Sequence, residues 1–289
     1  MNLFGQKQWR PWCLIIRLPR ILMACIVGCC LSAAGAAYQG VFQNPMAAPD
    51  ILGASSGAAF GAALAILFGA SNRIIMTSAF LLSLFTVSLV YFISLRVKGN
   101  KVIGLILSGI MVSSLFSAGT SFIKLVADPT NQLPAITYWL MGSLSGTTKN
   151  DLIIAVFPMS VGLLALYLFR WRINILTLGD HEARTIGINT SAVRLYVIIF
   201  STLITAASVS VSGMIGWVGL VIPHLSRKII GNNYKYLMPA AMVIGAIFLL
   251  LVDNVSRNLL EVEIPLGILT AFIGAPFFIY LITRKGEAH

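Results

Sequence analysis

The chain has 289 residues, of which 58% are hydrophobic and only 10% are charged, and its mean hydropathy is +0.90. Soluble domains carry about 25% charged residues, so this composition excludes an ordinary soluble protein and indicates an all-α integral membrane protein. A β-barrel is disfavoured because its strands alternate in character over about ten residues. The net charge of +11 does not indicate nucleic-acid binding, because the basic residues are spread among the gaps between apolar runs.

The apolar runs predict a polytopic helical bundle with nine membrane spans, since a helix needs about 20 apolar residues to cross a bilayer. A further short helix is expected over 134–146, after the breakers in ADPTNQLP, and it is too short to cross. In chain order, the nine predicted spans are 18–42, 55–71, 74–95, 102–126, 150–169, 191–212, 214–230, 237–258 and 264–283.

Lys and Arg indicate the orientation of the bundle. Twelve of them lie in the gaps 96–101, 170–194 and 227–235 and in the tail, whereas the gaps on the other side hold four. Because cytoplasmic loops carry the excess of basic residues, the first set of gaps and the C-terminus are expected to be cytoplasmic. The basic N-terminal residues Lys7, Arg10, Arg17 and Arg20 break this pattern, because nine spans place them outside.

Helix breakers interrupt the apolar pattern at two places, QNPMAAPDILG (43–53) and SGMIGWVGLVIPH (212–224). Non-helical backbone at membrane depth is tolerated only where protein or water covers it. Similar breaks in two halves of a transporter indicate inverted repeats around a pathway, and here the halves would be 18–126 and 191–283. In GASSGAAFG, glycine recurs at every fourth position, at Gly53, Gly57 and Gly61, and this spacing predicts close helix packing.

Six segments in register carry a resemblance to a known family over nearly the whole chain. They are IRLPR (16–20), QGVFQNPMAAPDILGASSGAAFGA (39–62), WLMGSLSG (139–146), LGDHEARTIGIN (178–189), GWVGLVIPHLSR (216–227) and IPLGILTAFIGAPFFIYLI (264–282). Together they resemble the permease family of ABC importers for iron–siderophore complexes, haem and cobalamin.

The resemblance implies the type II ABC importer permease fold as a single transmembrane domain over 1–289, without a cofactor. The implied partners are a second permease subunit in a homodimer, two cytoplasmic ATP-binding subunits and an extracytoplasmic substrate-binding protein. The family has ten spans, and its first helix precedes the IRLPR stretch. We therefore expect that helix to be missing and an N-terminal segment, 1–17, to stand in its place.

The charged stretch LGDHEARTIGIN is assigned a coupling role by the resemblance, because the matching family segment forms cytoplasmic coupling helices that sit in a groove of the ATPase. In this chain the coupling helices would occupy 178–190. We expect Asp180 to cap a short helix and Gly187 to end it. The alternatives are a solvated loop helix and a metal site, although adjacent helical residues cannot all face one ion. The coupling residues implied are Gly179, Asp180, His181, Glu182, Ala183, Arg184 and Gly187.

The resemblance also assigns docking of the binding protein to Arg17, Arg20 and Arg257, since the planar fork of Arg forms bidentate bonds with carboxylates. Snorkelling at the membrane edge and, for Arg257, pairing with acids of this chain such as Asp253 are the alternatives. Asp253 is the one intramembrane acid that we identify as a functional candidate.

Residues of the pathway or gate are expected among Ser113, Ser117, Thr120 and His224. Packing or backbone hydrogen bonding is the alternative for the hydroxyl residues, and a structural histidine is the alternative for His224. The sequence contains no Walker A motif and no cluster of metal ligands, so ATP hydrolysis is expected from a separate subunit and no bound metal or catalytic residue is expected.

These features predict the permease subunit of an ATP-driven importer of an iron complex, specifically a ferric siderophore, in the cytoplasmic membrane. Haem, cobalamin and molybdate stay open as cargo, because the recognised motifs serve assembly and coupling. An ion-coupled secondary transporter is disfavoured because it needs buried acids in mid-span, and a membrane enzyme because it needs convergent catalytic side chains.

Overall fold

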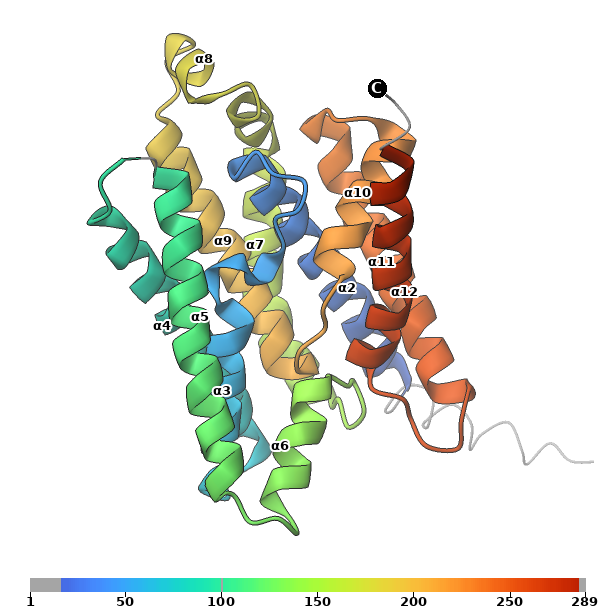
Figure 1. The fold of residues 1–289 in the computed structure, drawn as a ribbon. Coiled ribbons are helices and arrows are strands. Elements are labelled where there is room, and N and C mark those ends of the chain that lie inside the picture. Colours follow the sequence, from blue (N-terminus) through green and yellow to red (C-terminus); the bar gives the residue numbers. More distant parts are fainter. Residues whose placement is uncertain (1–16, 100, 286–289) are drawn as a thin grey trace, which may run out of the picture.

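The computed structural model describes residues 17–99 and 101–285, so the predicted N-terminal segment lies outside the described residues except for Arg17. Every regular element in this part of the chain is a helix (Figure 1). In chain order the elements are α2 (Leu18–Val41), the 3-10 helix η2 (Pro49–Leu52), α3 (Ala54–Leu67), α4 (Asn72–Leu95), α5 (Lys101–Val126), α6 (Gln132–Met141), α7 (Lys149–Leu176), α8 (Asp180–Thr185), α9 (Thr190–Ser212), α10 (Val218–Ile230), α11 (Tyr234–Asn258) and α12 (Leu266–Lys285).

Six helices, α2, α4, α5, α7, α9 and α11, are long and apolar enough to cross a membrane, so the chain is a multi-pass membrane protein. Helix α12 has 20 residues, of which the stretch to Tyr280 is apolar. The short helix predicted over 134–146 is present as α6. In Figure 1 this helix lies at the end of the bundle opposite α8, and we name the two ends the α6 end and the α8 end.

Two of the nine predicted spans, 55–71 and 214–230, have helices that are shorter than the predicted ranges. Helices α3 and α10 have 14 and 13 residues, which at 1.5 Å per residue gives about 20 Å, whereas the hydrocarbon core is about 30 Å thick. In each case non-helical backbone replaces the missing turns. The chain returns from the end of α2 to mid-height through residues 42–53 before α3 begins, and residues 213–217 lead from α9 to α10 in the same way (Figure 1). We name residues 42–53 and residues 213–219, the second of which includes the first two residues of α10, the re-entrant segments.

The predicted inverted repeats are confirmed by the order of the elements. Each repeat has a long helix, a re-entrant segment, a short helix and two further long helices: α2 to α5 in the first repeat and α9 to α12 in the second. The long first helices run in opposite directions, because α2 ends and α9 begins at the α8 end (Figure 1). Helix α2 packs most extensively on α11, and α9 packs on α4. The first helix of each repeat therefore packs on the third helix of the other.

Small residues allow these helices to pack closely, as expected where lipid provides no hydrophobic driving force. A Cβ added to Gly57 would lie 2.7 Å from the carbonyl oxygen of Leu82, and one added to Gly61 would lie 2.6 Å from that of Ser78. This confirms the close packing predicted for GASSGAAFG, which occurs between α3 and α4. The most buried spanning helices are α2 and α9, and they form the centre of the bundle.

Candidate functional site

The sequence-predicted functional residues lie in three parts of the bundle, beginning with α8. This six-residue helix protrudes beyond the membrane-spanning helices (Figure 1). Its side chains His181, Glu182 and Arg184 are exposed. The apolar side chains Leu178 and Ile186, on either side of it, are 60% and 57% exposed. Apolar groups that remain exposed outside the membrane indicate a surface that a partner covers.

Helix α8 is fixed to the bundle by a buried alanine and an ion pair. Ala183 is fully buried, and Asp180 Oδ1 accepts a hydrogen bond of 2.9 Å from Arg194 Nη2 at the start of α9. The Arg194 side chain is only 7% exposed, so this pair ties the first turn of α8 to a spanning helix. The expectation that Asp180 caps the helix is wrong: the N-cap is Gly179, which has no side chain, and Asp180 is the first helical residue.

The end of α8 has the geometry that the sequence predicts at Gly187. Gly187 adopts φ +84°, its N–H donates to the carbonyl of Arg184 at 2.9 Å, and the next N–H, of Ile188, donates to the carbonyl of Ala183 at 3.1 Å. These two bonds form a Schellman motif, which satisfies the last carbonyls of a helix through a left-handed residue. The end of α8 is therefore held in one defined turn that leads into α9.

A polar network at the α8 end connects both repeats. The Arg227 guanidinium donates to the side-chain carbonyl of Gln39 and, at 3.1 Å, to the Tyr234 hydroxyl, which donates in turn to the carbonyl of Ala36 at 2.9 Å. The carboxamide of Gln43, in the first re-entrant segment, donates to the carbonyl of Leu176, the last residue of α7, at 2.7 Å. The end of α7 beside α8 is thus bonded directly to the re-entrant segment.

The gate candidate His224 lines a cavity of about 530 Å³ beside this network. The wall of the cavity combines residues of the first re-entrant segment with residues from the end of α10 and the start of α11. It is lined by Gln39, Gln43, Asn44, Pro45, Thr177, His224, Arg227, Lys228, Asn232 and Tyr234.

The re-entrant segments meet in the middle of the bundle. Pro49 packs on the backbone of Gly219, where an added Cβ would collide with the proline ring and would lie 2.7 Å from the carbonyl oxygen of Leu31. Beside this contact lies Asp50, which is exposed and whose carboxylate accepts a hydrogen bond from Ser55. We did not predict a role for Asp50, although a signal was present: it is the only acidic residue among the first 127, and it lies within the first breaker stretch.

The hydroxyl residues predicted for the pathway follow one face of α5 but differ in exposure. Ser113 is half-buried beside Gly53, at the end of η2, where an added Cβ would lie 2.6 Å from its hydroxyl oxygen. Ser117 is exposed. Thr120 is buried and donates to the carbonyl of Phe116 at 2.9 Å. This hydrogen bond to the backbone is what we expected of a hydroxyl residue that does not line the pathway.

Of the predicted docking arginines, two form ion pairs within the chain at the α6 end. Arg20 is bonded to Asp253 at 2.9 Å and to Glu263 at 2.7 Å, and Arg257 is bonded to Asp253 at 3.1 Å. Asp253 is fully buried and joins α11 to α2, and its bond to Arg257 is the pairing within the chain that the sequence offered as the alternative. Arg17 is exposed.

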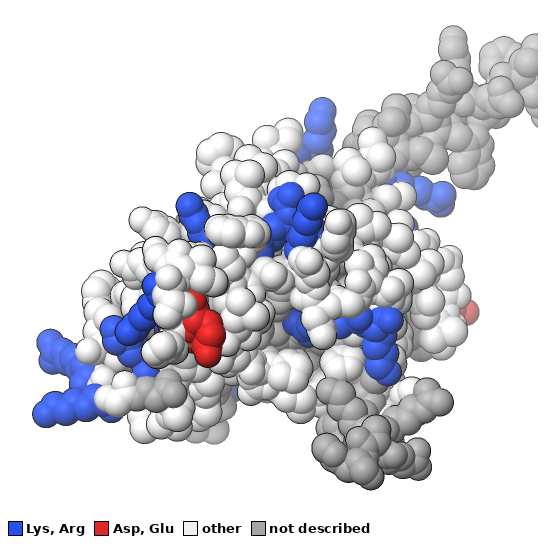
Figure 2. Space-filling model, turned by 90° about the horizontal axis from the view of Figure 1, so that it is seen from above, with Lys and Arg blue, Asp and Glu red and all other residues white. Residues whose placement is uncertain are grey.

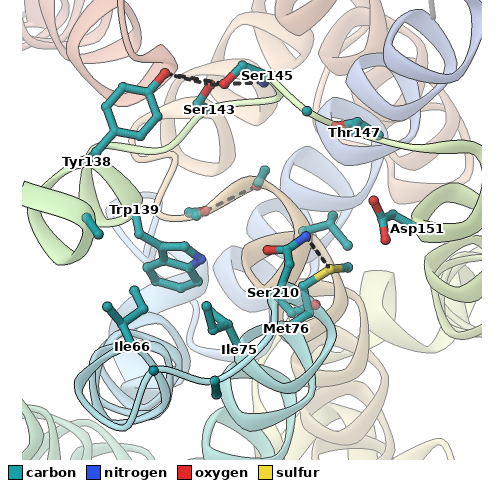
Figure 3. A pocket seen from close by; sticks show the side chains of 18 residues that line it. Ile66, Ile75, Met76, Tyr138, Trp139, Ser143, Ser145, Thr147, Asp151 and Ser210 are labelled. Atoms are coloured by element: carbon teal, nitrogen blue, oxygen red, sulfur yellow. Dashed lines mark hydrogen bonds between the residues drawn. The ribbon is translucent and has the colours of Figure 1, made fainter. Parts of the chain in front are cut away.

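A second cavity, of about 470 Å³, opens at the α6 end (Figure 3). Tyr138 and Trp139 of α6 form one wall, and Asp151 of α7 lies on the opposite side. Hydroxyl groups between them form hydrogen bonds, including 2.9 Å from Ser143 to Ser145 and 3.3 Å between Tyr138 and Ser145. This cavity is polar on one rim and aromatic on the other, and it lies on the face opposite α8.

Basic residues are concentrated on the α8 end, as predicted. Viewed from that end, the surface shows many Lys and Arg side chains and one small acidic patch (Figure 2). Among the described residues they are Arg96, Lys98, Lys101, Arg170, Arg172, Arg184, Arg194, Arg227, Lys228 and Lys235.

Comparison with known proteins gives a consistent result over almost the whole chain. The model of the FecCD transport family matches residues 2–284. The molybdate import system permease protein MolB of Haemophilus influenzae is 43% identical, with 94% of this chain and 81% of that protein covered. A protein of Helicobacter pylori described as a probable iron chelatin transport system permease is 42% identical, with 93% and 81% covered.

A solved structure shows the same fold. It is that of an ABC transporter assigned to the metal-chelate type, in an inward-facing conformation. Its TM-score is 0.92 at 41% identity, and the match covers 98% of this chain and 91% of the other. The fold, the protruding helix and these similarities lead to one conclusion: this chain belongs to the FecCD transport family and is a permease subunit of an ABC importer.

Proposed function

We propose that this permease carries an iron chelate of the ferric-siderophore class across the cytoplasmic membrane into the cell. Two copies would form the pathway, two ATP-binding subunits would bind at the α8 end, and an external binding protein would deliver the cargo to the α6 end. The observation that carries this arrangement is α8: a rigid, exposed helix with uncovered apolar neighbours, at the basic end that the positive-inside rule assigns to the cytoplasm.

Coupling follows from the contacts of α8. When ATP binding brings the two ATPase subunits together, a groove that holds α8 would displace it as a rigid body. The Asp180–Arg194 pair passes this displacement to α9, and the bond from Gln43 to Leu176 passes it to the first re-entrant segment. The parts that move would therefore include the segment that fills the middle of the bundle.

The choice of cargo rests on the placement of charge. Every Lys and Arg in the described part of the chain lies in a linker or within about two turns of a helix end. An oxyanion such as molybdate would therefore meet no positive side chain in the middle of the bundle, whereas a metal chelate that presents an organic surface does not require one. Haem and cobalamin are the remaining alternatives, since both also present an organic surface.

Uptake by reconstituted complexes tests the function. Proteoliposomes that contain the permease with its ATPase and binding-protein partners are supplied with a ferric siderophore, haem, cobalamin or molybdate. We expect ATP-dependent uptake of the ferric siderophore. ATP-dependent uptake of molybdate alone would refute the assignment of a ferric siderophore as the cargo. If a verified complex takes up none of the four compounds, the import function is refuted.

Docking of the binding protein is proposed to involve Arg17, the exposed arginine at the start of α2. Arg20 and Arg257 would act mainly by holding this region together, because their charges are paired with Asp253 and Glu263. Arg17→Glu should weaken binding of the external protein, measured by titration at low salt, where surface electrostatics are least screened. Arg73→Glu is the matched control, since Arg73 is exposed at the same end but lies at the start of α4. Equal affinities of the two variants would refute the role of Arg17.

A further inference from the structure

Asp50 lies deep within the bundle rather than at either end. Its neighbour Pro49 packs on Gly219 near Leu31, in the middle of α2, and its other neighbour, Ile51, places its carbonyl oxygen against Gly109 of α5. Gly109 is eight residues from the start of α5, or about 12 Å along the helix. Three different helices therefore place η2 well inside the membrane thickness, in agreement with its position between α5 and α10 (Figure 1).

Asp50 is an exposed residue at this depth, and its carboxylate forms no ion pair with the described residues. Its contact with a polar side chain is the hydrogen bond from Ser55. A charged side chain that faces lipid is costly, so charged residues inside membranes face a bundle interior or a water-filled cavity. The exposed side of η2 must therefore face water or protein, not lipid.

The surroundings of Asp50 provide further polar groups on the same side of the chain. Gly53, at the end of η2, donates its N–H to the carbonyl of Asp50 at 2.8 Å and lies beside the Ser113 hydroxyl of α5. Ser117, one turn further along α5, is exposed. A wall with a carboxylate and hydroxyls, set among apolar residues, fits the surface of an aqueous pathway.

We propose that Asp50 makes the middle of the transport pathway electronegative and thereby selects against anionic cargo. This inference rests on the proposed function, in which a second copy forms the opposite wall, so two Asp50 carboxylates would face the same passage. Oxyanions would be repelled at mid-depth, whereas neutral or cationic chelates, or chelates that offer hydrogen-bond donors, would pass. Asp50 is thus a specificity-determining residue that acts on the charge of the cargo.

The local charge can be measured with thiol reagents of opposite charge. Ser113→Cys is introduced into the assembled transporter after Cys13, Cys25, Cys29 and Cys30 have been replaced. The labelling rates by a cationic and an anionic methanethiosulfonate are then compared with Asp50 present and in Asp50→Asn. We expect Asp50→Asn to lower the cationic-to-anionic rate ratio several-fold, because one nearby charge acts with opposite sign on the two probes.

Three matched controls separate charge from structure. Asp50→Glu keeps the charge, and Ser55→Ala removes the hydrogen bond but keeps the carboxylate, so both should retain the ratio. Ser121→Cys places the probe two turns further along α5, about 12 Å away, which exceeds the screening length at physiological salt. Its ratio should not respond to Asp50→Asn.

Two results would overturn the inference. The first is that Asp50→Asn leaves the cationic-to-anionic labelling ratio at Ser113→Cys unchanged. The second is that neither reagent labels Ser113→Cys although both label Ser121→Cys. Labelling requires no transport, so failure of this inference can be distinguished from failure of the proposed function. If the Ser113 site is electronegative in a complex that shows no ATP-dependent uptake, import is refuted and the charge assignment still holds.

Discussion

A single glycine determines how the exposed helix α8 joins the bundle. Gly187 adopts a left-handed backbone conformation in open space, with no atom within 4 Å of an added Cβ. At the α6 end, a single buried carboxylate has the equivalent importance, because Asp253 neutralises two arginines from different helices. Gly187 acts through its backbone conformation and Asp253 acts through its charge, and the residues next to them cannot replace either property.

Gly187→Ala should reduce coupling between ATP hydrolysis and uptake. The left-handed conformation costs an L-residue about 1–2 kcal/mol, and relief of that strain would reorient α8. Gly69→Ala is the matched control, because Gly69 ends α3 with the same pair of backbone hydrogen bonds, has φ +66° and also has no atom near an added Cβ. Both variants should lose similar thermal stability in detergent, but only Gly187→Ala should lower the cargo transported per ATP hydrolysed. Equal coupling in the two would show that α8 is only a connecting loop.

Asp253→Asn should lower the free energy of unfolding by about 3 kcal/mol, the usual effect of removing one partner from a buried ion pair. Arg20 and Arg257 would lose their shared counter-charge at the junction of α2 and α11. Glu261→Gln makes the same change in charge on an exposed side chain of the adjoining linker and should have little effect. Denaturant titration of both variants in detergent measures the difference, and a loss below 1 kcal/mol for Asp253→Asn would contradict it.

Among the elements, the two re-entrant segments determine the character of the fold. Each replaces part of a spanning helix with turns or short helical pieces, and they touch at Pro49 and Gly219. This contact requires a residue without a side chain, because a Cβ on Gly219 would meet both the proline ring and the Leu31 carbonyl. The centre of the bundle is therefore a backbone contact between the two repeats.

Gly219→Ala should impair folding, since overpacking a well-packed contact costs about 1–3 kcal/mol and here the obstacle is partly backbone. Gly216→Ala, three residues earlier in the same re-entrant segment, is the matched control because an added Cβ there meets nothing within 4 Å. Folded yield and thermal unfolding in detergent report the result. Equal stability of the two variants would mean that the segments do not press on each other as described.

Hydropathy was sufficient to locate six spanning helices, and the paired breakers were sufficient to predict the inverted repeats. Hydropathy could not show that α3 and α10 are short, because apolar residues are compatible with both helical and extended backbone inside a bundle. Likewise, the pairing of Arg20 with Asp253 joins residues 233 positions apart, which no local pattern reports. Asp50 could have been found, since an isolated acid in a breaker-rich stretch of an apolar chain is unusual.

For the molecule as a whole, the uneven distribution of charge sets its orientation. The described Lys and Arg side chains are concentrated on the α8 end (Figure 2), whereas acidic residues of the other end neutralise arginines there. By the positive-inside rule, we propose that α8 and the C-terminal helix end face the cytoplasm.

Cysteine labelling tests this orientation. In a chain without native cysteines, His181→Cys should react with a membrane-impermeant maleimide only in inside-out vesicles, because α8 should face the cytoplasm. Glu261→Cys should react in intact cells, and it serves as the positive control for external labelling. Reaction of His181→Cys from outside intact cells would reverse the orientation and remove the site proposed for the ATPase.

The meeting of the re-entrant segments has a mechanical consequence. At the centre of this chain, two short helices from different repeats, η2 and α10, meet at Pro49 and Gly219. Because these two elements belong to different repeats, we expect a displacement of one repeat relative to the other to separate them.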